Sequence, residues 1–540
     1  MSLKNSTLRA KAIPIFIGLA ILTTSTWLTR SDTVAPRTEL ELLNYDELVQ
    51  LYQERNPPED LQRKLTTLLN TPFVDNSATS RGVRPLKPQT PKLGNFLRIA
   101  FWNIERGLEF EAIERAFRGS AAFSEILDGA THPPRSEKRY DVLNESILLK
   151  DADVIVLNEV DWGLKRTEYR HVARDLAAAL DMNYAYGVEF VEVDPVALGL
   201  DKLLDIPEED REEIISEIRV RPETYKGLHG TAILSRYPLE NVRVVPFKTQ
   251  PYDWYNSEKK GVALPEKGKR KLAQTIFLEQ LYRQVRRGGR MMLLADISDP
   301  DIPGGRATIV ATHLEPRAKP KERQQQLAEV FEKIKDIDHP VVLTGDLNTT
   351  GEDSTPTSFQ REIKKRLGSK SFWLHRGIAY VTGVGLVKDV VIGAVKYYRV
   401  QADPTVRHVP IVSPNPAAGF FEDLKKFRFD DGGAFDFRGD RERSHGRRSG
   451  VLANSNERGG KGFITTSEVK RTVGFVGRFK LDWIFVKPDG LDGPYDGTQS
   501  YRFAPHFGRT LKALNYALED RISDHSPMIV DLPFAEPTIE

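Results

Sequence analysis

The sequence predicts an α/β protein, and three observations lead to this class. Short, continuous apolar runs such as 99–102 and 154–157 have the length and composition of buried strands. Helical patterns alternate with these runs through the central part of the chain. The runs at 291–297 and 307–312 follow each other closely, as paired strands do, which argues against a purely parallel sheet.

The composition is that of an ordinary globular protein. The chain has 540 residues, of which 40% are hydrophobic and 29% charged, so it can bury a sizeable core. It contains no cysteine, which excludes disulfides, thiolate metal sites and cysteine nucleophiles. The net charge of +2 says little about partners. We expect one large domain at 96–535 with insertions near 194–223, 252–290 and 400–470.

The sequence of residues 1–31 predicts a signal peptide or an N-terminal membrane anchor. Basic residues precede an uncharged apolar run from Ala12 to Leu28, whose length lies between that of a signal-peptide core and that of a spanning helix. No convincing small-x-small cleavage site follows, which favours an uncleaved anchor over a cleaved signal peptide, with a buried helix as the third alternative. With the basic flank inside, the protein would be extracytoplasmic, either membrane-anchored or secreted.

Residues 32–95 predict two short helices followed by a linker. Leucines recur at helical spacing on both sides of Pro57 and Pro58. They are Leu40, Leu43, Leu48 and Leu51 in the first helix, and Leu61, Leu65 and Leu68 in the second. The stretch 71–94 is rich in Pro, Ser and Thr and has no periodicity, which is typical of a linker.

Polar side chains suited to phosphate chemistry stand where the predicted strands end. Asp346 and Asn348 follow the apolar run 340–343, and the period of two in an extended chain points both the same way. Their carboxylate and amide suit a divalent metal and a phosphate, although Asp-x-Asn alone is common in turns. The ordered series is more specific than any member: Asn103, Glu159, His313, Asp346 with Asn348, Asp482, and Asp524 with His525.

This series resembles the endonuclease/exonuclease/phosphatase superfamily of metal-dependent phosphoesterases, which includes deoxyribonuclease I. The strongest signatures of the superfamily, GD-x-N and SDH, stand here at 345–348 and 523–525. The resemblance covers approximately Leu97 to Leu532. It implies a four-layer sandwich of two face-to-face β-sheets flanked by helices, with the active site at one end and with insertions that small members lack.

The resemblance also implies a metal site. Glu159 would be the main ligand, Asn103 would help to orient the metal-site carboxylate and the phosphate, and Asp524 would complete the metal or histidine network. The implied ion is Mg²⁺, with Mn²⁺ and Ca²⁺ as alternatives. Deoxyribonuclease-like members support their first histidine with a further glutamate, for which Glu189 and Glu192 are the candidates here.

Five further residues receive catalytic roles from the resemblance. His525 would contact the attacking water or the phosphate, and Asp482 would hold its ring in one tautomer. His313 would donate to a phosphate oxygen. Asp346 would orient or deprotonate the water, and Asn348 would bind the phosphate. The implied reaction is in-line attack of water on phosphorus without a covalent intermediate.

The substrate is less constrained than the chemistry, because fold does not choose among the activities of this superfamily. The basic, aromatic-bearing insertion 252–290 fits nucleic acid or an anionic lipid surface, although charge runs are usually solvated faces, and the stretch 441–458 is equally ambiguous. We favour nuclease-type phosphodiester hydrolysis. The alternatives are a sphingomyelinase-like lipid or inositol-phosphate phosphoesterase and an inactive anchored binding module. The sequence does not indicate an oligomeric state.

Overall fold

The computed structural model describes a large part of the chain. The described residues are 42–193, 220–259, 285–349, 403–405, 408–409, 413–414, 417–460, 462–473, 476–491 and 501–537. The predicted membrane segment at 1–31 lies outside these ranges, as do most of the insertion at 194–223 and the middle of that at 252–290. Within the described ranges, no helix combines the length and the hydropathy needed to cross a membrane.

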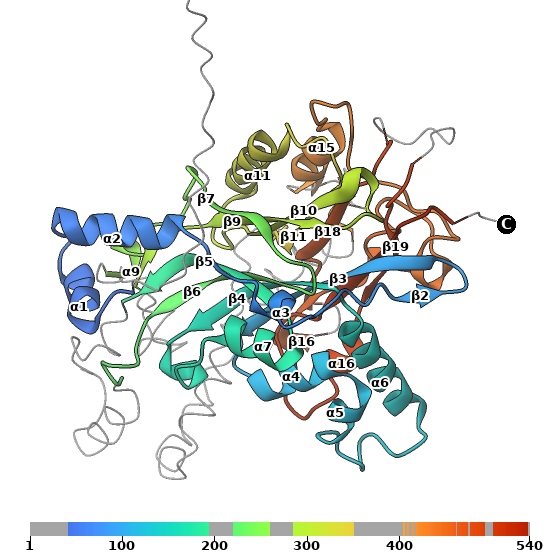
Figure 1. Ribbon diagram of the computed structural model, residues 1–540, viewed down its shortest axis with the longest axis horizontal. Coiled ribbons are helices and arrows are strands. Elements are labelled where there is room, and N and C mark those ends of the chain that lie inside the picture. The colour runs from blue at the N-terminus through green and yellow to red at the C-terminus, as the bar shows by residue number, and fades with distance from the viewer. Residues whose placement is uncertain are drawn as a thin grey trace, which may run out of the picture. The chain divides into compact units, whose positions relative to one another are not determined.

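The larger of two central β-sheets has the strand order β1-β5-β6-β4-β3-β20-β19, with β2 added beside β3 and β8 beside β5 (Figure 1). Strands β3 and β4 run parallel, whereas β20 pairs antiparallel with β3, and β6 with β4. The strands are β1 (Phe73–Asp75), β2 (Gln89–Thr90), β3 (Gly94–Arg106), β4 (Val154–Trp162), β5 (Asn183–Glu192), β6 (Leu228–Ser235), β8 (Arg286–Gly288), β19 (His506–Thr510) and β20 (Met528–Pro533).

The smaller sheet has the order β18-β11-β10-β9-β7. Strands β10 and β11 are parallel, and the predicted pairing of 291–297 with 307–312 is confirmed by the antiparallel contact of β9 with β10. Both sheets are therefore mixed, as the α/β prediction requires. The strands are β7 (Glu240–Pro246), β9 (Met291–Ser298), β10 (Arg306–His313), β11 (Val341–Asp346) and β18 (Asp482–Lys487).

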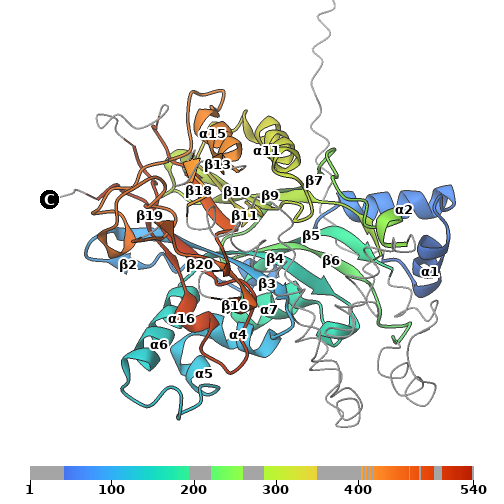
Figure 2. The same cartoon turned by 180° about the vertical axis from the view of Figure 1, so that it is seen from behind.

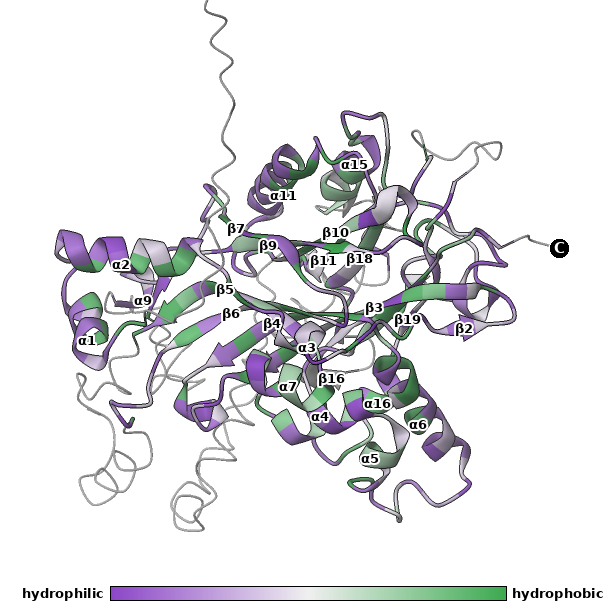
Figure 3. Ribbon diagram, in the orientation of Figure 1, coloured by the Kyte–Doolittle hydropathy of each residue, from purple (hydrophilic) through white to green (hydrophobic). Residues whose placement is uncertain are grey.

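The core lies in three layers, one between the sheets and one on the outer face of each. Strand β3 shows why, because alternate side chains point to opposite faces. Ile99 and Phe101 join the cluster between the sheets, which also receives β9, β10 and β11, whereas Ala100 and Trp102 join the outer cluster with the helices. In Figure 3, hydrophobic colour runs along both sheets, and the helices show both colours.

Helices cover both outer faces, which completes the predicted four-layer sandwich (Figures 1 and 2). On the larger sheet lie α1 (Tyr45–Gln53), α2 (Glu59–Asn70), α4 (Phe110–Arg118), α6 (Glu137–Lys150) and α7 (Val172–Leu180). On the smaller sheet lie α11 (Pro320–Ile334) and α15 (Ala418–Lys426). The shorter helices include α3 (Ser77–Ser80), α5 (Ser120–Ser124), α9 (Asn256–Lys259) and α16 (Lys512–Asn515).

Within the described residues, three small two-stranded sheets lie outside the two central sheets. They pair β12 (His408–Val409) with β13 (Ser413–Pro414), β14 (Arg458–Gly459) with β15 (Gly462–Phe463), and β16 (Ser467–Val473) with β17 (Val476–Phe479).

The stretch 71–94 differs from the predicted linker. Strand β1 pairs antiparallel with β5, with Phe73 opposite Tyr186, and β2 pairs with β3. The Asn76 side chain exchanges two hydrogen bonds with the backbone of Leu239. The Pro- and Ser-rich composition suggested a solvated connection, but backbone pairing and the burial of Phe73 hold this stretch on the sheet.

The described ends of the basic insertion 252–290 are tied to the protein. Arg287 donates to the carbonyl groups of Leu51 and Arg55 at the end of α1. Lys259 donates to the carbonyl of Gln53, 3.1 Å away. These cations therefore hold α1 on the sheet, and they are not the free basic surface that the composition suggested.

Candidate active site

The predicted site residues come together at one end of the two sheets, where β10 and β11 end and β18 begins. Strand register accounts for three of them, because His313 pairs with Asp346 across β10 and β11, and Asp346 pairs with Asp482 across β11 and β18. A Cβ atom on Gly345 would lie 1.8 Å from the carbonyl oxygen of Thr312. The glycine of the GD-x-N motif is therefore required for the close approach of these two strands.

Left-handed backbone, at a bulge within β4 and just beyond β11, directs other side chains into the site. Glu159 has a φ of 53°, and the register of β4 with β6 shifts between Leu157 and Val160. Such a bulge turns one side chain out of the alternating pattern. Asn348, just beyond β11, has a φ of 48°. Non-glycine residues pay a steric cost in this region, and such strain concentrates at functional sites.

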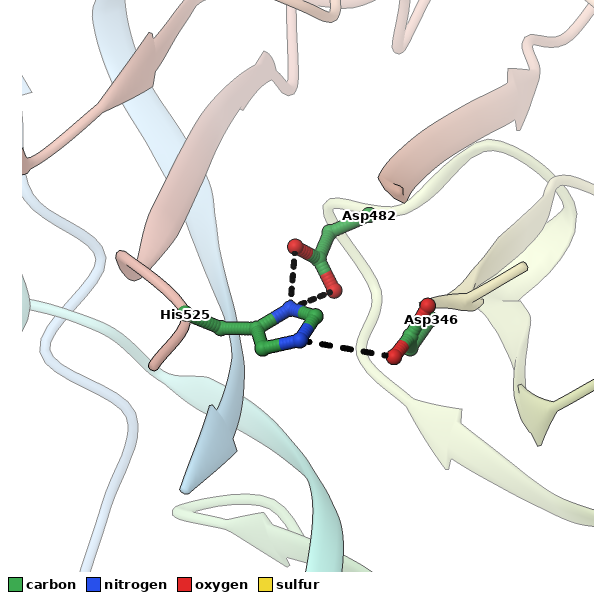
Figure 4. Close-up of side chains that lie close together, drawn as sticks. All are labelled: Asp346, Asp482 and His525. Carbon is green, nitrogen blue, oxygen red and sulfur yellow. Dashed lines mark hydrogen bonds and ion pairs between the residues drawn. The ribbon is translucent and has the colours of Figure 1, made fainter. Parts of the chain in front are cut away.

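Asp482 and His525 form a buried carboxylate–imidazole pair (Figure 4). The Nδ1 atom of His525 lies 2.8 and 3.0 Å from the two carboxylate oxygens of Asp482. Its Nε2 atom lies 3.7 Å from Oδ2 of Asp346. Burial acts to lower the pKa of His525, but Asp482, Asp346 and Asp524 outweigh it and raise the pKa well above its usual value. The carboxylates of Asp482 and Asp346, one on each ring nitrogen, therefore favour the charged form of His525.

The loop that carries His525 is fixed by β3. The indole Nε1 of Trp102 donates to the backbone carbonyl of His525 over 2.8 Å. The Ser523 hydroxyl donates to the carbonyl of Asn103 over 2.7 Å and accepts from the backbone N–H of His525. The serine of the SDH motif therefore positions the histidine two residues later.

Asn103 joins the two sheets within the site. Its Nδ2 lies 3.2 Å from Oε1 of Glu159 and 3.2 Å from Oδ2 of Asp346. Burial would raise the pKa of Glu159, but Arg106, His229 and His525 lower it overall. Burial, opposed by His525 and supported by Asp482, raises the pKa of Asp346 to about 7. Asp346 therefore holds its negative charge less readily than Glu159.

His313 has a different partner from the one predicted. Its Nε2 lies 3.6 Å from Oδ2 of Asp346, and its Nδ1 lies 2.8 Å from Nη1 of Arg290. Burial, together with Arg290, lowers the pKa of His313 well below its usual value. Glu189, one candidate for the supporting glutamate, contacts Arg290 over 2.6 Å, while Glu192 pairs with other arginines. An arginine therefore stands where a glutamate was expected.

Asn348 and Asp524 lie at the site, and both form hydrogen bonds within the protein. The amide nitrogen of Asn348 donates to the carbonyl of Leu314, and its backbone N–H donates to Oδ1 of Asp346. The backbone N–H of Asp524 donates to Glu105, and a carboxylate oxygen of Asp524 lies 3.5 Å from the Ser523 hydroxyl. Phosphate binding by Asn348 and metal binding by Asp524 stay predictions.

Comparison with known proteins places this arrangement in a family. A sequence model described as Endonuclease/Exonuclease/phosphatase family matches residues 100–525. The chain belongs to this family. Its members are phosphoester hydrolases that generally depend on a divalent metal. No curated protein matches the chain in sequence.

Several solved structures resemble this member of the endonuclease/exonuclease/phosphatase family at low identity. One is an endonuclease/exonuclease/phosphatase from Beutenbergia cavernae, with 16% identity, a TM-score of 0.37, and coverage of 82% of this chain and 73% of that chain. A second is the human Nocturnin catalytic domain with bound sulfate anion, with 13% identity, a TM-score of 0.34, and coverage of 81% and 93%. A third is D. rerio TDP2 complexed with single strand DNA product, with 14% identity, a TM-score of 0.29, and coverage of 81% and 98%.

The donor atoms at this site fit the divalent metal on which the endonuclease/exonuclease/phosphatase family generally depends. The carboxylates of Glu159 and Asp346 both contact the amide of Asn103. The carboxylates of Asp346 and Asp482 also lie close together, with ligand atoms within 4.8 Å of each other. Carboxylate and amide oxygens are the ligands that hard cations prefer, and a cation would offset the repulsion among these carboxylates. Glu159, with Asn103 and Asp346 beside it, would hold the ion.

The sequence analysis missed several residues that hold the site residues in place. Asn158 accepts from the backbone N–H of Asp346 and donates to the Thr231 hydroxyl, both over 2.9 Å. His229 is buried, with its Nδ1 2.8 Å from Asp161. His229 stands just before the apolar run 232–234, a position that could have marked it. Arg290 carried no such signal, because it lies among many basic residues of the predicted insertion.

Proposed function

We propose that this chain is a Mg²⁺-dependent phosphodiesterase that hydrolyses its substrate by in-line attack of water, with nuclease-type activity. The observation that carries the proposal is the position of the Asp482–His525 pair. It lies 3.7 Å from Asp346, and the same Asp346 oxygen lies 3.2 Å from the amide of Asn103, which also contacts Glu159. One carboxylate oxygen is thus shared by the acid–base groups and the metal-binding groups.

The side chains divide the work of hydrolysis around Oδ2 of Asp346. When bound, the metal would supply Lewis-acid stabilisation of the phosphoryl oxygens. Asp346 would orient the attacking water and take its proton, since its pKa of about 7 suits a general base near neutral pH. The imidazolium of His525 would donate from Nε2 to a phosphoryl oxygen as negative charge develops there. The oxygen–phosphorus bond to water forms as the bond to the leaving oxygen breaks on the opposite side, and this oxygen departs with the bonding electron pair and takes a proton from solvent.

A basic rim beside His525 supports a polyanionic substrate. Strand β16 reaches the SDH loop, where Ser467 forms a β-bridge with His525. On this rim, the carboxylate of Glu468 contacts Arg478 and Lys512, and its backbone carbonyl accepts a hydrogen bond from Arg521. The three cations gathered beside Glu468 would attract a phosphodiester backbone. An anionic lipid or an inositol phosphate carries related charge and is the alternative substrate.

We also propose that the protein acts outside the cytoplasm, anchored to or released from a membrane through its N-terminal apolar run. This run is preceded by basic residues and contains no charge from Ala12 to Leu28. Fractionation of cells that express the full chain tests the placement. Recovery of the protein in the cytoplasmic fraction would contradict it.

Hydrolysis assays of the purified full chain test the activity. With Mg²⁺, we expect hydrolysis of a generic phosphodiester such as bis(p-nitrophenyl) phosphate, and loss of this activity with a chelator. His525→Ala should lower kcat by about 10³-fold, because it removes the group that stabilises the developing charge. His132→Ala, at a half-exposed position on the loop before α6, is the matched control and should keep full activity.

A substrate panel separates the nuclease proposal from its alternatives. We expect single-stranded and plasmid DNA to be cleaved faster than sphingomyelin or inositol polyphosphates. Faster cleavage of either lipid-type substrate would replace the nuclease proposal and keep the phosphodiesterase. Cleavage of phosphomonoesters alone, or full activity in the His525→Ala variant, would contradict the proposed mechanism itself.

A further inference from the structure

The guanidinium of Arg290 contacts one of the two ring nitrogens of His313. The two side chains meet over 2.8 Å, between Nη1 of Arg290 and Nδ1 of His313. A guanidinium group has only donors and does not lose its proton in proteins. Nδ1 of His313 must therefore accept this hydrogen bond. An accepting Nδ1 leaves the ring neutral, with its proton on Nε2.

Arg290 is held firmly enough to impose this arrangement. It is 2% exposed. Its Nη1 also donates to Glu189 over 2.6 Å, and its Nε donates to Glu315 over 3.3 Å. Its guanidinium lies 5.1 Å from the centre of the Phe190 ring, on which it stacks. Two carboxylates compensate its charge, so the arginine can stay buried beside the imidazole.

The same hydrogen-bond network fixes the two groups that face each other across the site. From Glu189 the network continues to the Thr231 hydroxyl over 2.6 Å, and from there to Asn158. Asn158 accepts from the backbone N–H of Asp346. The network thus connects His313 to the backbone of Asp346. The two side chains also lie near each other directly, with Oδ2 of Asp346 3.6 Å from Nε2 of His313. Both groups are positioned by one buried circuit.

We propose that Arg290 is a positioning residue that fixes His313 as the neutral Nε2–H tautomer, so that His313 donates a hydrogen bond to the phosphoester and does not transfer a proton to the leaving group. The proposal rests on the phosphoesterase activity proposed above. A carboxylate on Nδ1 would instead favour the imidazolium, which can act as a general acid.

Long-range ¹H–¹⁵N NMR of the metal-free full chain, labelled at histidine, tests the tautomer directly. Such spectra show which ring nitrogen carries a proton, and His313→Gln identifies the signals of His313. We expect an unprotonated Nδ1 and a protonated Nε2 at neutral pH. A proton on Nδ1, with or without one on Nε2, would overturn the proposal. This measurement on the unaltered protein does not depend on the folding of any variant.

Two arginine variants separate positioning from general support of the fold. Arg290→Met should lead to a different tautomer mixture or to imidazolium at His313, because Glu189 and Glu315 would lose their cation. Arg317→Met is the matched control, since Arg317 stacks on Trp254 near the site and pairs with Glu258. We expect the His313 signals to be unchanged in this control. An unchanged His313 spectrum in Arg290→Met would overturn the proposal.

Kinetics provide a second readout. Arg290→Met should lower kcat by about 10- to 100-fold with a much smaller change in KM, because the hydrogen bond from His313 strengthens in the transition state. Added guanidinium ion should restore part of the loss in Arg290→Ala, and no rescue in a folded variant would count against the positioning role. If the chain hydrolysed no phosphodiester, the proposed function would fail, while the NMR result would still decide the tautomer.

Discussion

The two histidines of the site occupy similar positions, but their partners on Nδ1 carry opposite charges. His525 precedes β20 of the larger sheet, His313 ends β10 of the smaller sheet, and both are buried. Their Nε2 atoms lie 3.7 and 3.6 Å from the same oxygen of Asp346. On the far nitrogen, however, one ring has the carboxylate of Asp482 and the other the guanidinium of Arg290.

This difference gives the two rings different chemistry. Burial disfavours the charged form of both. On the His525 side the surrounding carboxylates overcome burial, and the pKa rises well above its usual value. On the His313 side burial and Arg290 act together, and the pKa falls well below it. The group on Nδ1 therefore decides whether Nε2 belongs to a cation or to a neutral donor.

Removing the carboxylate from the His525 side should have the largest effect. Asp482→Asn leaves an amide that can hydrogen-bond to the ring but cannot stabilise its charge, so we expect kcat to fall by about 10³-fold. Steady-state hydrolysis of a phosphodiester measures this loss. Asp489→Asn is the control, because Asp489 is a partly exposed carboxylate just beyond β18. A loss of less than about tenfold would mean that His525 does not need to be charged.

Removing the carboxylate predicted to hold the metal should have the second-largest effect on activity. It should leave the different protonation states of His525 and His313 unchanged. Glu159→Gln is expected to weaken Mg²⁺ binding by about 10- to 100-fold and to lower activity at limiting metal by a similar factor. Calorimetric titration with Mg²⁺ gives the affinity. Glu168→Gln, at an exposed glutamate with a side-chain exposure of 78%, should bind the ion normally. Unchanged affinity in Glu159→Gln would remove Glu159 from the metal site.

A smaller change should act through the hydrogen-bond network that joins His313 to Asp346. Thr231→Val keeps the shape of the side chain but removes the hydroxyl between Asn158 and Glu189. We expect about a fivefold loss of kcat and about 1–2 kcal/mol of unfolding free energy, since buried polar atoms lose a partner. Thr308→Val, which breaks a buried hydrogen bond to Asp296, should cost similar stability without the kinetic loss. Equal kcat values for both variants would show that the circuit does not reach the chemistry.

A buried carboxyl outside the site tests the same electrostatic reasoning with the smallest effect on activity. Burial raises the pKa of Glu145 from 4.5 to about 7. Because the folded pKa is the higher one, this group stabilises the fold below about pH 4.5 and the contribution is lost as pH rises through about 7. Between pH 5 and 8, unfolding free energy should fall by about 2 kcal/mol more in the original protein than in Glu145→Gln. Denaturant unfolding at several pH values measures this difference, and parallel curves for the two proteins would contradict it.

The sequence predicts the fold and the chemistry of this site better than it predicts how the site is braced. Strand-end positions identify Asp346, Asp482 and His525, because apolar runs and short motifs are local patterns. Asn158 and Thr231 act through contacts between strands that are distant in sequence, and local periodicity carries no information about such contacts. Strand β1 was likewise hidden in a Pro- and Ser-rich stretch, since its pairing with β5 involves backbone groups and not side-chain type.

Arg290 shows the same limit most clearly. Its sequence neighbours Arg286 and Arg287 are equally basic, yet Arg286 pairs with Glu192 and Arg287 binds carbonyl groups at the end of α1. Among these three, the described contacts bring Arg290 alone to a histidine of the site. A run of basic residues suggested a surface for a partner, whereas folding gives each of these arginines a different internal contact.

The charge states of both rings, measured together in one sample, test the difference between the histidines most directly. In a long-range ¹H–¹⁵N spectrum of the metal-free full chain at neutral pH, we expect His525 to carry protons on both nitrogens and His313 to carry one, on Nε2. Signals would be identified from the His525→Gln and His313→Gln variants. The same protonation state at both rings would contradict the conclusion that the partner on Nδ1 gives these two histidines different roles.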